Sequence, residues 1–105
     1  MPKTCAAIAV LAFAAGACAA RPDPKKGREV FSAQCAVCHN ADNTEKKTGP
    51  GLKGLYKRAK LVNGQMVTDA TVRAKIDQGG SGMPAYRDLL ADDEKSALLA
   101  YLKTL

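Results

Sequence analysis

The sequence predicts an all-α fold, with three main helices joined by loops and one short helix. Three stretches, at residues 24–39, 69–78 and 90–105, combine apolar residues at helical spacing with signals for a helix start or end. No strand-helix-strand pattern is present, and the flanks of the turn at Asn63-Gly64 are too short for a stable hairpin. A length of 105 residues indicates one domain.

Residues 1–20 have the three-part pattern of a secretory signal peptide. Lys3 supplies the positive charge, an Ala-rich apolar stretch follows, and small residues precede a cleavage site after Ala19 or Ala20. The alternative is an uncleaved membrane anchor, although the 17 residues between Lys3 and Arg21 are at the lower limit for a spanning helix. We therefore expect a leader at 1–20, one domain at 21–105, and export to the periplasm.

The end of this leader also resembles a bacterial lipoprotein signal. In such a signal, cleavage after Ala17 makes Cys18 the acylated first residue of the mature chain. These signals usually carry Leu where this chain has Ala15, so simple cleavage remains an open alternative. With a lipid at Cys18, the domain would be tethered to a membrane surface.

The first helix is expected over residues 24–39, with Asp23 as its cap and Pro24 at its first position. Cys35, Cys38 and His39 then share one helix face. Their C-x-x-C-H spacing is the attachment signature of a c-type haem, in which two thiols add to the porphyrin vinyl groups and the imidazole reaches the iron. A structural zinc site would need further ligands, and a thioredoxin-like pair would need a neighbouring strand pattern; the chain has neither.

The segment after Asn40 is polar and rich in turn-forming residues around Gly49-Pro50. A proline offers a carbonyl and no N–H, so the Pro50 carbonyl can accept a hydrogen bond from the outer ring nitrogen of His39. The alternative is an ordinary turn. A short helix is expected over residues 52–59, with Leu55 and Tyr56 directed inward.

The next helix is expected to begin after a cap at Thr68 or Asp69, to bury Val72 and Ile76, and to end at Gly79-Gly80. The loop beyond it contains Met83, in an extended stretch restricted by Gly and Pro. His39 is the only histidine, so a thioether is the remaining protein ligand that suits a haem iron. Met66 has apolar neighbours and is expected to fill the core, whereas nothing local requires an apolar residue at Met83. The sixth ligand is therefore expected to be Met83, with Met66 or an open site as alternatives.

The last helix, over residues 90–105, carries acidic residues in its first turn and Lys103 in its last, as the helix dipole favours. Its apolar stripe includes Leu98, Tyr101 and Leu102. The expected partner of this stripe is the face of the first helix that contains Gly27 and Phe31. A glycine inside a helix is then explained by the close approach of a second helix; the alternative is that a glycine is tolerated near a fraying helix start.

The formal net charge of +6 is unevenly distributed. A basic segment at residues 46–60 contains five lysines and Arg58 and no acidic residue, whereas residues 88–94 hold four acids. This segment is either an ordinary solvated surface or a patch that steers an acidic partner into an encounter. No nucleic-acid partner is expected, because the chain is expected to be exported.

In this order, the motifs resemble those of small single-haem c-type cytochromes of class I, with His/Met ligation. The resemblance covers nearly the whole of residues 21–105. It implies a cytochrome c fold wrapped around one covalently bound haem, with helices crossing at Gly27, Phe31 and Tyr101. It also implies that Pro50 bonds His39 and that Met83 ligates the iron. Relatives often cap the last helix with Ser or Thr where this chain has Ala91, and Asp92 is expected to replace that cap.

These observations favour a periplasmic one-electron carrier and not an enzyme. Its partners are expected to be redox proteins with acidic docking surfaces, and the chain is expected to be a monomer or a subunit of a redox complex. Three alternatives remain: a dedicated cytochrome subunit of a periplasmic dehydrogenase, a haem enzyme or gas sensor with a displaceable sixth ligand, and a non-haem metal or thiol protein.

Overall fold

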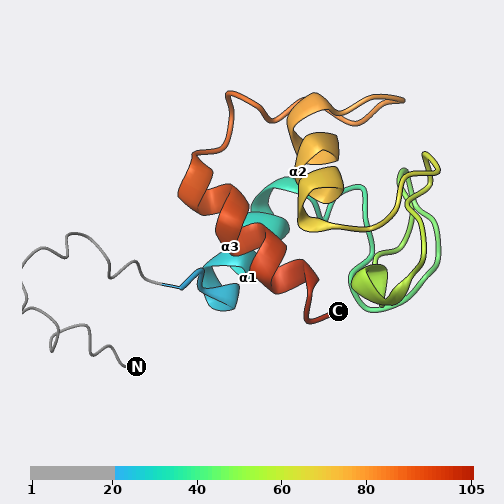
Figure 1. The fold of residues 1–105 in the computed structure, drawn as a ribbon, viewed down its shortest axis with the longest axis horizontal. Coiled ribbons are helices and arrows are strands. Elements are labelled where there is room, and N and C mark those ends of the chain that lie inside the picture. The colour runs from blue at the N-terminus through green and yellow to red at the C-terminus, as the bar shows by residue number, and fades with distance from the viewer. Residues whose placement is uncertain (1–20) are drawn as a thin grey trace, which may run out of the picture.

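The computed structural model describes residues 21–105, which form an all-α domain (Figure 1). The elements are α1 (Pro24–Gln34), the 3-10 helix η2 (Leu55–Lys57), α2 (Asp69–Gln78) and α3 (Asp92–Leu102). Strand pairing in this part of the chain is limited to two isolated bridges. None of these helices is long and apolar enough to cross a membrane. The expected leader at 1–20, with Cys18, lies outside the described residues.

Helix α1 begins as expected but ends five residues early. The Asp23 carboxylate accepts a hydrogen bond of 2.9 Å from the Lys25 N–H, and Pro24 occupies the first turn. At the other end, the N–H groups of Cys35 and Ala36 share one acceptor, the Phe31 carbonyl. This sharing stops the regular ladder of hydrogen bonds, so the helix ends at Gln34 and not at His39. The C-x-x-C-H residues therefore lie in the turns that follow α1.

The core is built where α1 and α3 cross, as Figure 1 shows. Gly27 is buried at this crossing, and a Cβ atom added to it would lie 1.9 Å from the Ala97 carbonyl oxygen. The rings of Phe31 and Tyr101 meet beside it with centroids 5.5 Å apart. Leu98 is only 1% exposed. The expected contact between the first and last helices is thus confirmed, and it explains the glycine.

Helix α2 follows the local signals in the sequence. The Thr68 side chain accepts a hydrogen bond from the Thr71 N–H, and the Thr71 hydroxyl accepts one from the Thr68 N–H. Val72 and Ile76 are buried, and the helix ends at Gly79, whose φ of 65° few other residues adopt. The cap, the buried pair and the end of the helix are confirmed.

Helix α3 spans Asp92–Leu102, which is shorter at both ends than residues 90–105. Ala91 is at the cap position, and its N–H donates a hydrogen bond of 2.8 Å to the Glu94 carboxylate. Asp92 does not replace the missing cap, contrary to expectation. It is the first helical residue, and its carboxylate pairs with Arg73 of α2 at 2.6 Å.

The connection between α1 and α2 is mostly irregular. The short helix expected over residues 52–59 is reduced to η2, in which Leu55 is buried and Tyr56 half-buried. The Tyr56 hydroxyl donates to the Asp69 carboxylate at 2.9 Å, and Lys103 pairs with the same carboxylate at 3.0 Å. The expectation that Met66 fills the core is wrong: it is 68% exposed, because it flanks the tight turn at Asn63-Gly64 on the surface.

Candidate functional site

The C-x-x-C-H residues are brought together by one irregular turn after α1. The N–H groups of Cys38 and His39 both bond to the Cys35 carbonyl, at 3.0 Å each. Cys35 and Cys38 are half-buried and not bonded to each other, while Val37 between them is 77% exposed. Burial, reinforced by the neighbouring Cys38, raises the pKa of the Cys35 thiol to about 11. Both thiols thus lie at the boundary between core and solvent, where a large apolar group can contact them and remain partly exposed.

The His39 ring is held in one orientation by the following loop. Its Nδ1 lies 2.8 Å from the Pro50 carbonyl oxygen, and a carbonyl can only accept. Nδ1 therefore carries a proton, and in the neutral imidazole the free lone pair is on Nε2. Gly49 packs against the same ring: a Cβ atom there would lie 2.5 Å from His39 Cε1.

Several further bonds hold this loop against the motif. The Gly49 N–H donates to the Cys38 carbonyl at 2.8 Å, and the Lys47 ammonium donates to the Ala36 carbonyl at 2.8 Å. Arg58 donates to the Gly51 carbonyl at 2.8 Å, which braces the loop from η2. The sequence indicated the contact with Pro50 but not these lateral bonds, because they depend on how the loop folds back.

Met83 lies on a separate loop and is half-buried against the core. This loop is a tight turn, not the extended stretch expected. Gly80 and Met83 exchange two backbone hydrogen bonds of 2.9 and 3.0 Å, and Ser81 and Gly82 between them both have positive φ. In the view of Figure 1, the turn extends from the end of α2 toward the same side as the long connection between α1 and α2.

Tyr86 ties the Met83 loop to the C-x-x-C-H turn. Its N–H donates to the Ile76 carbonyl at 2.9 Å, and its hydroxyl donates to the carbonyl of Gln34, the last residue of α1, at 3.0 Å. Burial, followed by the charges of Cys35 and Cys38, raises the pKa of Tyr86. The sequence offered one signal for Tyr86, a tyrosine close after Met-Pro in a largely polar segment, but no role was evident from it.

The donor set fits a covalently bound haem. Two half-buried thiols can form thioether links, an oriented imidazole presents Nε2, and a thioether sulfur is available from a second, pinned loop. Such a ligand set matches iron in a porphyrin better than zinc, which prefers four thiolate or imidazole ligands in structural sites.

Comparison with known proteins agrees with this chemistry. Residues 22–102 match the family described as cytochrome c oxidase, cbb3-type, subunit III. Cytochrome c6 of Leptolyngbya boryana is 34% identical over 80 residues, which cover 76% of this chain and 89% of that protein. The cbb3-type cytochrome c oxidase subunit FixP of Azorhizobium caulinodans is 36% identical over 85 residues, but these cover only 28% of FixP.

A solved structure leads to the same conclusion. Cytochrome c6 from the diatom Phaeodactylum tricornutum superposes with a TM-score of 0.62 at 25% identity, covering 78% of this chain and 92% of that one. The family match, the cytochrome c6 relatives and this common fold imply one covalently bound haem c. The chain therefore belongs to the family of cytochrome c oxidase, cbb3-type, subunit III, and is a small c-type cytochrome.

Proposed function

We propose that this cytochrome is a periplasmic one-electron carrier and not an enzyme. Cys35 and Cys38 would hold the haem covalently, and His39 and Met83 would ligate its iron. The observation that carries this proposal is the 2.8 Å contact between His39 Nδ1 and the Pro50 carbonyl, which engages Nδ1 and leaves Nε2 as the nitrogen that can bind iron. When bound, the haem supplies the ferrous/ferric couple. With both axial positions taken by protein, no position is open for a substrate.

The Pro50 carbonyl tunes the imidazole as well as orienting it. A hydrogen bond donated by Nδ1 increases the electron density at Nε2 and so strengthens it as a ligand. Gly49 contributes by its lack of a side chain, because any Cβ atom there would displace the ring. The ring is therefore fixed before any electron moves, which keeps structural change during transfer small.

Met83 provides a neutral thioether, a ligand that favours the reduced state and raises the potential. The Gly80–Met83 turn and the bonds of Tyr86 hold its backbone on both sides of the ligand. A pinned loop keeps the sulfur in place and keeps water from the sixth position. These properties suit electron transfer better than ligand exchange.

The surface near the attachment site suits a transient redox partner. Val37 is exposed beside both cysteines and offers a small apolar contact. Lys47 and Arg58 of the basic segment bond to loop carbonyls, which leaves the other lysines of this segment, all exposed and outside the three ion pairs of the described residues, as the steering charges. These are Lys46, Lys53, Lys57 and Lys60. We infer a redox partner with an acidic docking surface, bound more weakly at high salt.

Residues 1–20 support export to the periplasm, with either release of the leader or a lipid at Cys18. Intact mass of the protein purified from its native host tests this assignment. One mass would report the haem, the cleavage site and any acyl chains together. A mass that retains residues 1–20 would contradict both forms of the export proposal.

The ligand assignment is tested by replacing Met83 with Ala. We expect a changed visible spectrum and a lower potential, because the thioether that favours ferrous iron is lost. Met66→Ala is the matched control: this second methionine is 68% exposed, so its loss should change neither colour nor stability. A Met83→Ala protein with the spectrum and potential of the parent would show that Met83 is not the ligand.

A fixed subunit of a redox complex is a second candidate, favoured by the similarity to FixP, which is an oxidase subunit by name. Co-purification of a partner in high salt would support it, since a complex held by steering charges dissociates there. A haem enzyme or gas sensor would instead bind carbon monoxide rapidly in the reduced state at neutral pH.

A further inference from the structure

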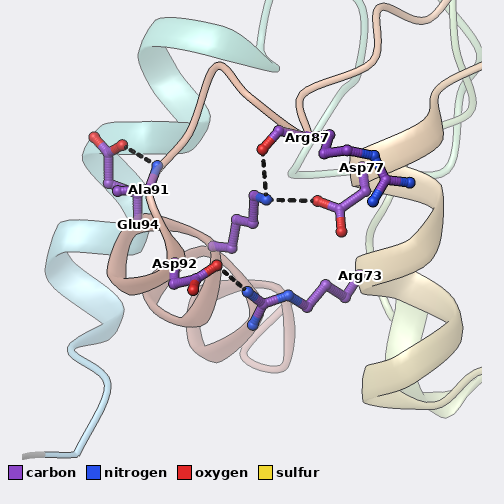
Figure 2. A network of polar contacts seen from close by, with 7 residues as sticks. Arg73, Asp77, Arg87, Ala91, Asp92 and Glu94 are labelled. Carbon is purple, nitrogen blue, oxygen red and sulfur yellow. Dashed lines mark hydrogen bonds and ion pairs between the residues drawn. The ribbon is translucent and has the colours of Figure 1, made fainter.

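A buried lysine lies between the Met83 loop and the last helix. Among residues 21–105, Lys95 of α3 is the charged residue that is buried, with 4% of its surface exposed. Its side chain reaches from α3 to Asp77 and to the Arg87 carbonyl, and both of these partners are labelled in Figure 2. Burying an ammonium group is costly unless it is paired, so this position calls for an explanation.

The ammonium group joins three segments of the chain. Its Nζ lies 2.7 Å from Asp77 Oδ1, near the end of α2, and donates to the Arg87 carbonyl at 2.9 Å, just beyond the Met83 loop (Figure 2). Asp77 Oδ1 is itself buried and makes no aligned hydrogen bond within the described residues, so the ammonium is the charge that compensates it. Lys95 is also the main cause that holds the pKa of Asp77 below its ordinary value, against the effect of burial.

Cross-linking the two helices does not by itself require a buried ion pair. Arg73 and Asp92 already connect α2 with α3 at 2.6 Å, on the surface and without touching the Met83 loop (Figure 2). A buried ion pair also adds little stability compared with apolar residues of similar volume. What distinguishes Lys95 is its bond to Arg87, because this bond fixes the backbone where the loop returns to the core.

The two ends of the loop are thus held differently. At its start, the Lys75 ammonium donates to the Gly79 carbonyl at 3.2 Å, and Gly80 pairs with Met83. At its end, the Arg87 N–H donates to the Asp77 carbonyl at 3.2 Å, and Lys95 bonds both Asp77 and the Arg87 carbonyl. Without Lys95, the backbone pairing at this end would lose its buried support.

We propose that Lys95 is a positioning residue for the sixth haem ligand: its bonds to Asp77 and Arg87 hold the end of the Met83 loop and suppress opening of the iron–sulfur bond. This inference rests on the proposed ligation by Met83. It predicts that Lys95 controls how often the sixth position becomes accessible, although the polar partners of its ammonium group are Asp77 and Arg87 and not Met83.

The test measures carbon monoxide binding to the reduced, haem-loaded protein, together with the reduction potential. Lys95→Met keeps a long apolar stem and removes the charge. We expect carbon monoxide to bind at least about tenfold faster than to the parent, equivalent to about 1.4 kcal/mol of loop-opening free energy. We also expect a lower potential and a weaker absorption from thioether-ligated ferric iron. Lys95→Arg, which keeps a charged donor, should restore part of each value.

Asp77→Asn keeps the size of the side chain and the Lys95–Arg87 bond, so it decides the question if Lys95→Met fails to fold. It should accelerate carbon monoxide binding by a smaller factor. Val30→Ala, at a buried position of α1, is the control for a general loss of stability. Carbon monoxide binding to each protein is measured at the same interval below that protein's own thermal midpoint. The surface variant Asp92→Asn controls for loss of an α2–α3 ion pair and should bind at the parental rate.

Two outcomes would overturn this proposal. One is a Lys95→Met protein with the binding rate and potential of Val30→Ala. The other, where Lys95→Met does not fold, is an Asp77→Asn protein with the parental rate and potential. Failure of the underlying ligation is seen separately, because the parent and Met83→Ala would then bind carbon monoxide at the same rate. If Met83→Ala changes the rate of carbon monoxide binding but the Lys95 and Asp77 variants do not, Met83 is the ligand and only the positioning role of Lys95 is refuted.

Discussion

Replacing Gly27 with Ala adds one methyl group at the crossing of α1 and α3. The added carbon would lie 1.9 Å from the Ala97 carbonyl oxygen and 2.7 Å from Tyr101 Cβ. Non-bonded carbon atoms pack at about 3.5–4.0 Å, so the contact with Tyr101 Cβ alone requires the two helices to separate by roughly 1 Å, and the shorter contact with the Ala97 oxygen requires more. A rotamer change cannot relieve the contact, because the nearest atom belongs to the backbone of Ala97.

Two opposing effects set the size of the change in stability. Ala is favoured over Gly inside a helix by about 1 kcal/mol. Overpacking of a core costs about 1–3 kcal/mol, and a clash with backbone places this site near the upper end. The net loss is then about 2 kcal/mol, which lowers the thermal midpoint of a domain of this size by about 8–16 °C.

Thermal unfolding of the haem-loaded protein, followed by far-ultraviolet circular dichroism, measures this loss. Ala33→Gly at an exposed position of the same helix provides the control, because it isolates the propensity effect and should lower the midpoint by about half as much. If Gly27→Ala raised the midpoint, as propensity alone predicts, the reasoning about the tight crossing would be refuted.

Three further predictions concern the site and its supports. Gly49→Ala places a Cβ atom 2.5 Å from His39 Cε1, so the ring must turn away from Pro50. A redox titration should then show a shifted potential. An unchanged potential would show that the orientation of the ring does not tune the potential. Tyr86→Phe removes one buried hydrogen bond and should lower the unfolding free energy by about 1 kcal/mol in urea titrations, and no loss would contradict the link between the Met83 loop and α1. Asp69 has a pKa lowered mainly by its bond to Lys103, so its stabilising effect is present above its ordinary value of 3.8 and is lost as the pH falls through the folded-state value. The thermal midpoint of Asp69→Asn should therefore lie below that of the parent at neutral pH and converge with it in acid, and a constant difference across this range would refute the assignment.

Local chemistry in the sequence determined where α1 and α2 begin, where α2 ends, and what the motif after α1 is for. Asp23-Pro24, Thr68 and Gly79 act on backbone groups within a few residues, so their effects were readable without any tertiary contact. The C-x-x-C-H spacing is equally local, and it predicted a covalently bound haem before the fold was considered. The crossing at Gly27 was also predicted, because a glycine inside a helix is costly and close approach of a second helix is one reason to keep it.

Only the tertiary structure decided which side chains are buried and how the two ligand-bearing segments are held. Met66 and Lys95 show this most clearly: an apolar residue beside Val is exposed on a surface turn, and a charged residue in a helix is buried against Asp77 and Arg87. The bond from Tyr86 to Gln34 likewise joins residues 52 positions apart. The physical reason is that helix caps and motif spacing depend on neighbours along the chain, whereas burial and loop anchoring depend on surfaces that meet only after the helices have packed.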